Sequence, residues 1–222
     1  MPLPAHSNDP LIKAFPAELA GDAEKVLAAM PASSLPLHAP FMVVVQGQQV
    51  SIPGRIYHDE PPAEAEASLS ARQRQLLHCL YSRHCDGTVR QRHIAKIVDS
   101  ADPWVIPFVV QLVGEYVVEI LIAICADLRD LVAPGTTGHR LAYGQFIVDN
   151  PAFFARVQRR VVSYWSCYYR SAYPTFRDYP GCTLLDLLRA AASDSAGRPW
   201  PDLTPAAGTR PTPPAVASRL SH

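Results

Sequence analysis

The first candidates for chemistry are two glutamates, which lie in the most apolar stretch of the chain, residues 103–131. Gln111, Glu115 and Glu119 are spaced four residues apart, which places them on one narrow stripe of a helix. A stripe that faces water needs no partner, whereas a buried one needs cations, because an unpaired buried charge is costly. A carboxylate in a cleft with a raised pKa can also act as a general base, so Glu115 and Glu119 are candidate catalytic residues.

The segment before this stretch supplies cationic partners. Five candidates lie there: Arg83, His84, Arg90, Arg92 and His93. A buried arginine–glutamate network would be structural, and we favour it over catalysis. The alternative is a small-molecule or metal-dependent enzyme in which the two glutamates meet His84, Arg90 and His93 in a pocket. In that hypothesis His93 is the third catalytic candidate, and Arg90 and Arg92 are binding residues.

The same segment also holds side chains that can bind zinc. Only His84 or Cys85 with His93 has a spacing that allows convergence, across the turn at Asp86-Gly87. These three residues are therefore the candidate metal ligands. Core cysteines and surface histidines explain the segment equally well, so no cofactor is predicted and zinc is left open.

An arginine–aromatic helix is expected over residues 150–172, where Asn150 precedes Pro151. Its core-facing stripe is Phe154, Val157, Val161, Trp165 and Tyr168. Arg156, Arg160 and Arg170 lie on the other side, and arginines beside exposed tyrosines can bind phosphate or stack bases. Lys+Arg and Asp+Glu are both 20, however, whereas proteins that coat nucleic acid are normally basic. We therefore disfavour nucleic acid as a partner and favour a solvated face.

The elements that must position these residues are mainly helical. Gln46-Gly47 supplies a hairpin turn within a β-branched segment, and Ser70 and Gln73 have the spacing of a capping box. The 22 prolines concentrate toward the two ends. We expect a mainly α fold, with an orthogonal or bundle-like helical domain, a small β-hairpin and disordered ends. The expected ranges are an irregular segment with a short helix at 1–40, the hairpin at 41–57, the helical domain at 69–192 and a proline-rich disordered tail at 193–222.

One long helix is expected over residues 103–131, and its length is close to that of a membrane span. Two glutamates near its middle cost about 2.5–3.5 kcal/mol each on insertion scales, which offsets much of the gain from its apolar residues. A core helix is the better interpretation, and no membrane association is predicted.

A local pattern resembles the second helix of HEAT-type helical repeats. It consists of Asp86, Val89 and Arg90 followed by Ile97, with His93 where those repeats have a small residue. It covers one helix pair, and nothing recurs at a period of about forty residues. The resemblance implies that two helices pack here as they do in such a repeat.

The remaining signals bear on function only broadly. The five cysteines are odd in number and include no CxxC, which favours reduced thiols and a cytoplasmic location. Short motifs of nucleotide-binding loops, serine hydrolases and zinc proteases are missing. We therefore expect a non-catalytic protein-interaction or structural module rather than an enzyme, with a protein partner or a second copy of the chain in a homodimer.

Overall fold

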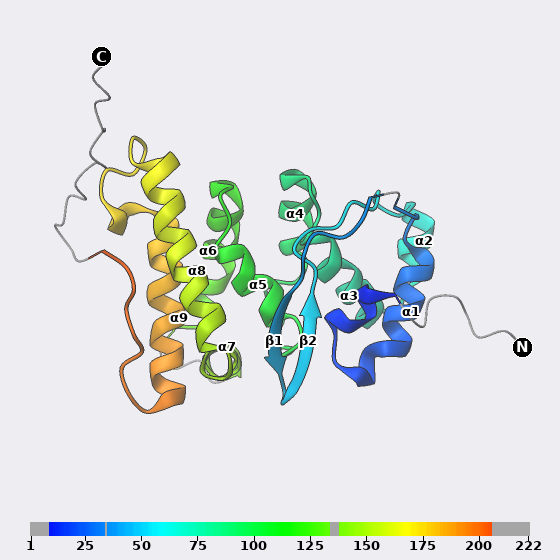
Figure 1. Ribbon diagram of the computed structural model, residues 1–222, viewed down its shortest axis with the longest axis horizontal. Helices are drawn as coiled ribbons and strands as arrows, with labels where there is room; N and C mark the ends of the chain where they lie inside the picture. The colour runs from blue at the N-terminus through cyan, green and yellow to red at the C-terminus, as the bar shows by residue number, and fades with distance from the viewer. Residues whose placement is uncertain (1–8, 34, 134–137, 206–222) are drawn as a thin grey trace, which may run out of the picture.

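The chain folds into a mainly helical structure with one small hairpin, as the sequence predicts. The computed structural model describes residues 9–33, 35–133 and 138–205, and all structural statements concern these residues. Figure 1 shows α1 (Ala20–Ala29), α2 (Ala63–Ser68) and α3 (Ala71–Tyr81) toward one end of the long axis. The other end is built from α7 (Gly138–Asp149), α8 (Pro151–Tyr164) and α9 (Pro180–Ala196). The hairpin, α4 (Gly87–Ile94) and α5 (Ile106–Val113) lie between the two ends.

The hairpin pairs β1 (Phe41–Val45) with β2 (Gln48–Ile52) in antiparallel register. Gln46 and Gly47 have φ values of 50° and 79°, which is the left-handed conformation that a two-residue hairpin turn requires. An isolated hairpin is marginal in water, so its packing matters. The Asn150 side chain accepts a 2.7 Å hydrogen bond from the Val44 amide and donates one of 2.8 Å to the Val44 carbonyl. The junction of α7 and α8 therefore holds β1 in place.

Among the N-terminal helices, the first 3-10 helix and α3 begin with a side-chain cap, whereas α1 and α2 do not. Two 3-10 helices, Pro10–Ala14 and Ala17–Leu19, precede α1. The Ser70 hydroxyl accepts from the Gln73 amide at 3.2 Å and the Gln73 side chain accepts from the Ser70 amide at 3.0 Å, so the predicted capping box opens α3. Helix α2 occupies residues that lie outside the predicted helical domain, between the hairpin and α3.

The single long helix predicted over residues 103–131 is wrong. The structure has two helices, α5 and α6 (Val118–Leu131), separated by residues 114–117. Gly114, a poor helix former, ends α5, and Val117 is extended with φ −81° and ψ 106°. Glu115 turns into the interior at this break, where its carboxylate meets two arginines. No helix in the described part of the chain is long and apolar enough to cross a membrane.

Helix α8 continues into a π-helical turn, Trp165–Tyr169, before a 3-10 helix at Phe176–Asp178 and then α9. The predicted core stripe holds from Phe154 to Trp165, but the placement of Tyr168 in the core is wrong, since Tyr168 is 67% exposed. The wider π turn shifts the inward position by one residue to Tyr169, which packs against the core.

Helix α9 runs to Ala196, past the predicted start of the tail at residue 193. Residues 197–205 follow along α8 and α9, where the Leu203 amide donates a 3.2 Å hydrogen bond to the Gln158 side chain. The outer parts of the two predicted disordered ends, residues 1–8 and 206–222, lie outside the described residues.

Candidate functional site

Glu115 lies at the centre of an arginine cluster. It is 2% exposed, and its Oε2 is 2.8 Å from Nη2 of Arg55 and 3.4 Å from Nε of Arg90. Its Oε1 accepts a 3.0 Å hydrogen bond from the Tyr116 amide. Burial raises the pKa of Glu115, but the charges of Arg55 and then Arg90 outweigh it, so the net pKa is lowered. Glu115 is therefore an ionised partner of arginines, as the structural hypothesis predicts.

Arg90 anchors this cluster to the turn between α3 and α4. It is 1% exposed, and its Nη1 donates hydrogen bonds of 2.9 Å to the carbonyls of both His84 and Cys85. The break after Gly114 places Glu115 against this guanidinium. One buried ion pair thus ties the α5–α6 break to the start of α4.

Arg83, like Arg90, has a buried guanidinium with incomplete hydrogen bonding, and Arg83 lines a pocket. It is 1% exposed, its Nε donates to the Pro53 carbonyl at 3.2 Å and its Nη2 donates to the Gly54 carbonyl at 2.6 Å. Its Nη1 is buried and has no hydrogen-bond partner among the described residues. Burial, and next the charge of Arg55, lowers the pKa of Arg83, although a guanidinium stays protonated in proteins. Keeping the Arg83 cation buried with incomplete compensation therefore costs the folded state free energy.

A pocket of about 380 Å³ opens beside Arg83. Its walls come from the segment before β1, the turn after β2, α5 and α8. Arg55, Arg83, Arg156 and Arg160 line it together with Gln111 and the apolar side chains of Phe41, Phe153 and Val157. No carboxylate is among the described residues that line it.

The pocket places two of the predicted binding residues with two arginines that sequence reasoning did not group with them. Arg156 and Arg160 reach it from α8, while Arg55 follows the Pro53-Gly54 turn. Arg156 and Arg160 have no ion-pair partner in the described part of the chain. Guanidinium groups around an acid-free cavity are suited to binding a phosphate or a carboxylate through charge-assisted, bidentate hydrogen bonds.

The other predicted residues lie elsewhere. Glu119 is exposed in the first turn of α6, so the structure does not place it beside Glu115. Arg170 is half-buried with its guanidinium 5.1 Å from the centre of the Trp165 ring, away from the pocket lining. Arg92 is exposed and forms an ion pair with Glu60. These three residues do not converge with the arginine cluster.

The predicted metal ligands are not brought together. His84 Nδ1 accepts a 3.0 Å hydrogen bond from the Asp86 amide, and it lies 4.0 Å from the exposed Cys85 sulfur. His93 faces different partners. The described residues contain no group of three or more His, Cys, Asp or Glu side chains that could hold a metal ion. The geometry therefore gives no support to the zinc hypothesis.

His93 is part of a buried chain of hydrogen bonds. Its Nε2 is 2.9 Å from Oε1 of Glu60, and its Nδ1 is 3.0 Å from Nδ1 of His78. A carboxylate only accepts, so Nε2 of His93 carries the hydrogen and its Nδ1 accepts from His78. His78 Nε2 then carries a lone pair, 3.8 Å from Oε1 of Glu66. Burial lowers the pKa of both imidazoles, that of His78 to about 4, so both are neutral near pH 7.

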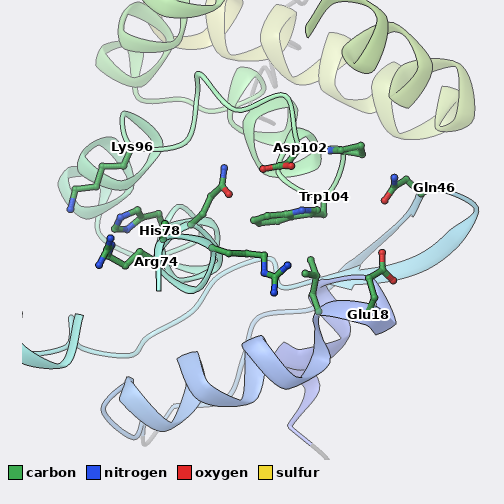
Figure 2. A pocket seen from close by; sticks show the side chains of 12 residues that line it. Glu18, Gln46, Arg74, His78, Lys96, Asp102 and Trp104 are labelled. Atoms are coloured by element: carbon green, nitrogen blue, oxygen red, sulfur yellow. The ribbon is translucent and has the colours of Figure 1, made fainter. Parts of the chain in front are cut away.

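His78 also lines a second, larger cavity of about 650 Å³. Figure 2 shows Arg74, His78 and Lys96 on one side of this cavity, Glu18 and Gln46 on the other, and the Trp104 indole between them. Two of the three cations that line it have acidic partners, whereas Arg74 donates to the Leu69 carbonyl at 2.8 Å. Lys96 lies 3.4 Å from Glu66, and Arg72 lies 2.7 Å from Asp22. We call this space the histidine cavity and the first one the arginine pocket.

Sequence reasoning missed Arg55, His78 and Glu60 as site residues. Arg55 lies after β2, and Glu60 lies between the predicted hairpin and the predicted helical domain, so no helical period connects them with Glu115 or His93. The dipeptide Pro53-Gly54 is typical of a turn and is a local indication that the chain reverses beside Arg55. A comparison of the chain with protein-family models, curated proteins and solved structures finds no match.

Proposed function

We propose that the protein binds a small anionic ligand, through a phosphate or carboxylate group, in the arginine pocket and carries out no chemistry on it. The observation that supports this most is the buried Nη1 of Arg83, a cationic donor with no partner among the described residues. An anion among the pocket arginines would compensate the charge of this guanidinium, which lines the pocket although its Nη1 is shielded from solvent. A donor left unsatisfied in the interior otherwise costs roughly 1–3 kcal/mol, and more when it is charged.

The size and lining of the pocket fit such a ligand. Its volume of about 380 Å³ is in the range of small-molecule sites. Phe41, Phe153 and Val157 supply apolar walls that lower the local dielectric, which strengthens each guanidinium–anion contact. Gln111 adds an amide that can donate to the same ligand.

A non-catalytic role is supported by the state of the nearest carboxylate. Both oxygens of Glu115 already accept, from Arg55 and from the Tyr116 amide, and its pKa is lowered. A general base needs a pKa close to the working pH, and Glu115 has shifted in the opposite direction. The enzyme alternative with Glu115, Glu119 and His93 therefore has less support than binding.

The test uses inorganic phosphate as the probe, with sodium chloride of equal ionic strength as the reference. We expect phosphate to raise the Tm of the protein, since a ligand that binds only the folded state stabilises it. Arg156→Gln should weaken phosphate binding about tenfold or more, because a charge-assisted hydrogen bond is worth roughly 1.5–3 kcal/mol.

Arg159→Gln is the matched control. Arg159 is exposed on the same helix, does not line the pocket and carries the same charge. Equal losses in the two variants would indicate a general charge effect, and no phosphate shift beyond that of chloride would overturn the proposal.

A protein partner, a homodimer and a cytoplasmic location stay predictions. Besides two tyrosines, five large aliphatic side chains are exposed among the described residues, but they lie on different segments: Leu35, Met42, Ile122, Leu141 and Leu203. All five cysteines lie in the described residues and none is in a disulfide, which supports a reducing compartment.

A further inference from the structure

Two tyrosines continue the line of the pocket arginines along α8. Arg156, Arg160, Tyr164 and Tyr168 follow one another at intervals of four residues, which keeps them on one side of the helix. The Arg160 guanidinium carbon lies 5.7 Å from the centre of the Tyr164 ring, and its Nη2 donates a 3.4 Å hydrogen bond to the Tyr164 hydroxyl. Arg160 therefore belongs to the pocket and to the tyrosine group at the same time.

Tyr116, Tyr164 and Tyr168 form an exposed aromatic group, which we call the tyrosine shelf. The Tyr164 ring centre is 6.1 Å from that of Tyr116 and 6.3 Å from that of Tyr168. Tyr116 is 50% exposed and Tyr168 is 67% exposed. Exposure of two large aromatic rings beside a charged pocket is an unusual use of apolar surface, and aromatic side chains of this kind stack on flat ligands.

The backbone under the shelf is held by two residues, Glu115 and Tyr169. The Tyr116 amide donates to Oε1 of Glu115, the carboxylate that pairs with Arg55. The Tyr116 carbonyl accepts a 2.5 Å hydrogen bond from the Tyr169 hydroxyl, which the π turn directs inward. The π turn thus exposes Tyr168 while Tyr169 fixes Tyr116, and such turns occur frequently at functional sites.

The spacing fits a particular class of ligand. Four residues along a helix correspond to a rise of about 6 Å, so an anion on Arg160 lies about one sugar-sized spacer from the Tyr164 ring. Inorganic phosphate would bind in the arginine pocket without contacting the tyrosine shelf. A phosphate joined through a sugar to a planar ring would occupy both.

We propose that the ligand of the arginine pocket is a mononucleotide-like molecule, with its phosphate among the arginines and its aromatic base stacked on the tyrosine shelf. This inference rests on the proposed function, because the phosphate anchors the ligand. The shelf contacts the flat face of the ring, which every base shares, so it supplies affinity without choosing among bases.

The test compares three probes by calorimetry: inorganic phosphate, ribose 5-phosphate and adenosine 5′-monophosphate. We expect the mononucleotide to bind about 5–100-fold more tightly than ribose 5-phosphate, which lacks only the base. Tyr168→Ala should remove about tenfold of the mononucleotide affinity and leave the affinity for ribose 5-phosphate unchanged. Tyr168→Phe should retain the mononucleotide affinity, since its ring still stacks.

Leu141→Ala is the matched control, because Leu141 is also a large exposed side chain but lies on α7. Equal affinities for the mononucleotide and ribose 5-phosphate would overturn this inference and leave anion binding intact. Loss of ribose 5-phosphate binding in Tyr168→Ala would also overturn it, because that loss would indicate a structural role. If none of the three probes binds, the proposed function falls as well.

Discussion

The arginine pocket and the histidine cavity both contain buried titratable side chains, yet they treat charge in opposite ways. In the histidine cavity, Lys96 has Glu66 at 3.4 Å and the neighbouring His93 has Glu60 at 2.9 Å. Burial lowers the pKa of His78 to about 4, so this imidazole stays neutral instead of requiring a counter-charge. Of the charged or titratable groups here, Lys96 and Arg72 are therefore paired and His78 is uncharged, while Arg74 donates a 2.8 Å hydrogen bond to the Leu69 carbonyl.

Beside the arginine pocket, by contrast, one carboxylate serves two cations. Glu115 forms ion pairs with Arg55 and Arg90, whereas Arg83, Arg156 and Arg160 have no ion-pair partner among the described residues. Of these three, only Arg83 is buried, and a buried cation is costly unless it is paired, so a fold that retains Arg83 in this state is best explained by an anion that arrives from outside. We infer from this difference that paired buried charges have a structural role, whereas an unpaired buried charge indicates a ligand site.

The largest effect is expected at Glu115, the carboxylate that pairs with Arg55 and Arg90. Glu115→Gln removes the carboxylate and leaves Arg90 buried and unpaired, so the free energy of unfolding should fall by about 3–5 kcal/mol. Urea unfolding measures this loss. Added phosphate should restore part of it, because the anion replaces the missing negative charge. Glu119→Gln, at an exposed position, should change stability by no more than about 0.5 kcal/mol.

A loss below about 1 kcal/mol in Glu115→Gln would break the comparison, since the arginines would then be stable without any counter-charge. Full stability loss with no recovery in phosphate would show that the anion does not reach the cluster.

The next effect concerns the pocket wall at Gly54. A Cβ added there would lie 2.4 Å from Nδ1 of His38 and 2.6 Å from the carbonyl oxygen of Ala39. Gly54→Ala should therefore displace the segment before β1 and the Arg55 beside it. We expect about a tenfold loss of phosphate affinity and a stability loss of about 1–3 kcal/mol, measured by calorimetry and urea unfolding.

Gly21→Ala is the control for Gly54→Ala. Gly21 lies in α1, where an added Cβ meets nothing within 4 Å, so this change should be neutral or slightly stabilising. Unaltered phosphate binding in Gly54→Ala would remove the 38–39 segment from the pocket wall.

A smaller effect is expected on the side of the histidine cavity, through pH. Burial, followed by the charge of His93, lowers the pKa of His78 from 6.5 to about 4. Between these two pH values, the unfolded chain binds a proton at His78 and the folded chain does not. The free energy of unfolding therefore decreases as the pH falls from 6.5 toward 4. We expect Tm to drop by about 5 °C over this window. His78→Leu should flatten that slope, and an unchanged slope would assign it to other groups.

Much of the fold could be predicted from the sequence because it depends on local patterns. The hairpin turn at Gln46-Gly47 and the capping box at Ser70 depend on residues that are neighbours along the chain, and both are confirmed. The break after Gly114 could not be predicted in the same way. Gly114 is a local signal for it, but the flanking residues 106–113 and 118–126 are mostly apolar and suited to a helix, and Glu115 is held inward by a contact with Arg55, 60 residues away.

For the same reason, only part of the candidate site could be predicted from the sequence. Arg156 and Arg160 stand out by their period along α8, and Arg90 by its place near Glu115 in the sequence. Arg55 and Glu60 carry no periodic signal, because the chain that brings them in is irregular. The exposure of Tyr168 was hidden by a single extra residue in the π turn, which no helical period anticipates.

The smallest effect is expected for the histidine chain, the hydrogen-bonded series of Glu60, His93 and His78. Glu60 accepts from Nε2 of His93 and thereby fixes the hydrogen of His78 on its Nδ1. Glu60→Ala removes this acceptor, so nitrogen NMR should report a mixture of His78 tautomers in place of one. Stability should change by about 1 kcal/mol or less, because the Glu60 side chain is 37% exposed.

Arg92→Ala is the matched control for Glu60→Ala, since Arg92 pairs with the same carboxylate but contributes nothing to the histidine chain. It should leave the His78 tautomer unchanged. Both variants should bind phosphate like the unaltered protein, because the histidine cavity shares no lining residue with the arginine pocket. A change in phosphate affinity in Glu60→Ala alone would mean that the two regions are coupled through α4, which carries both Arg90 and His93.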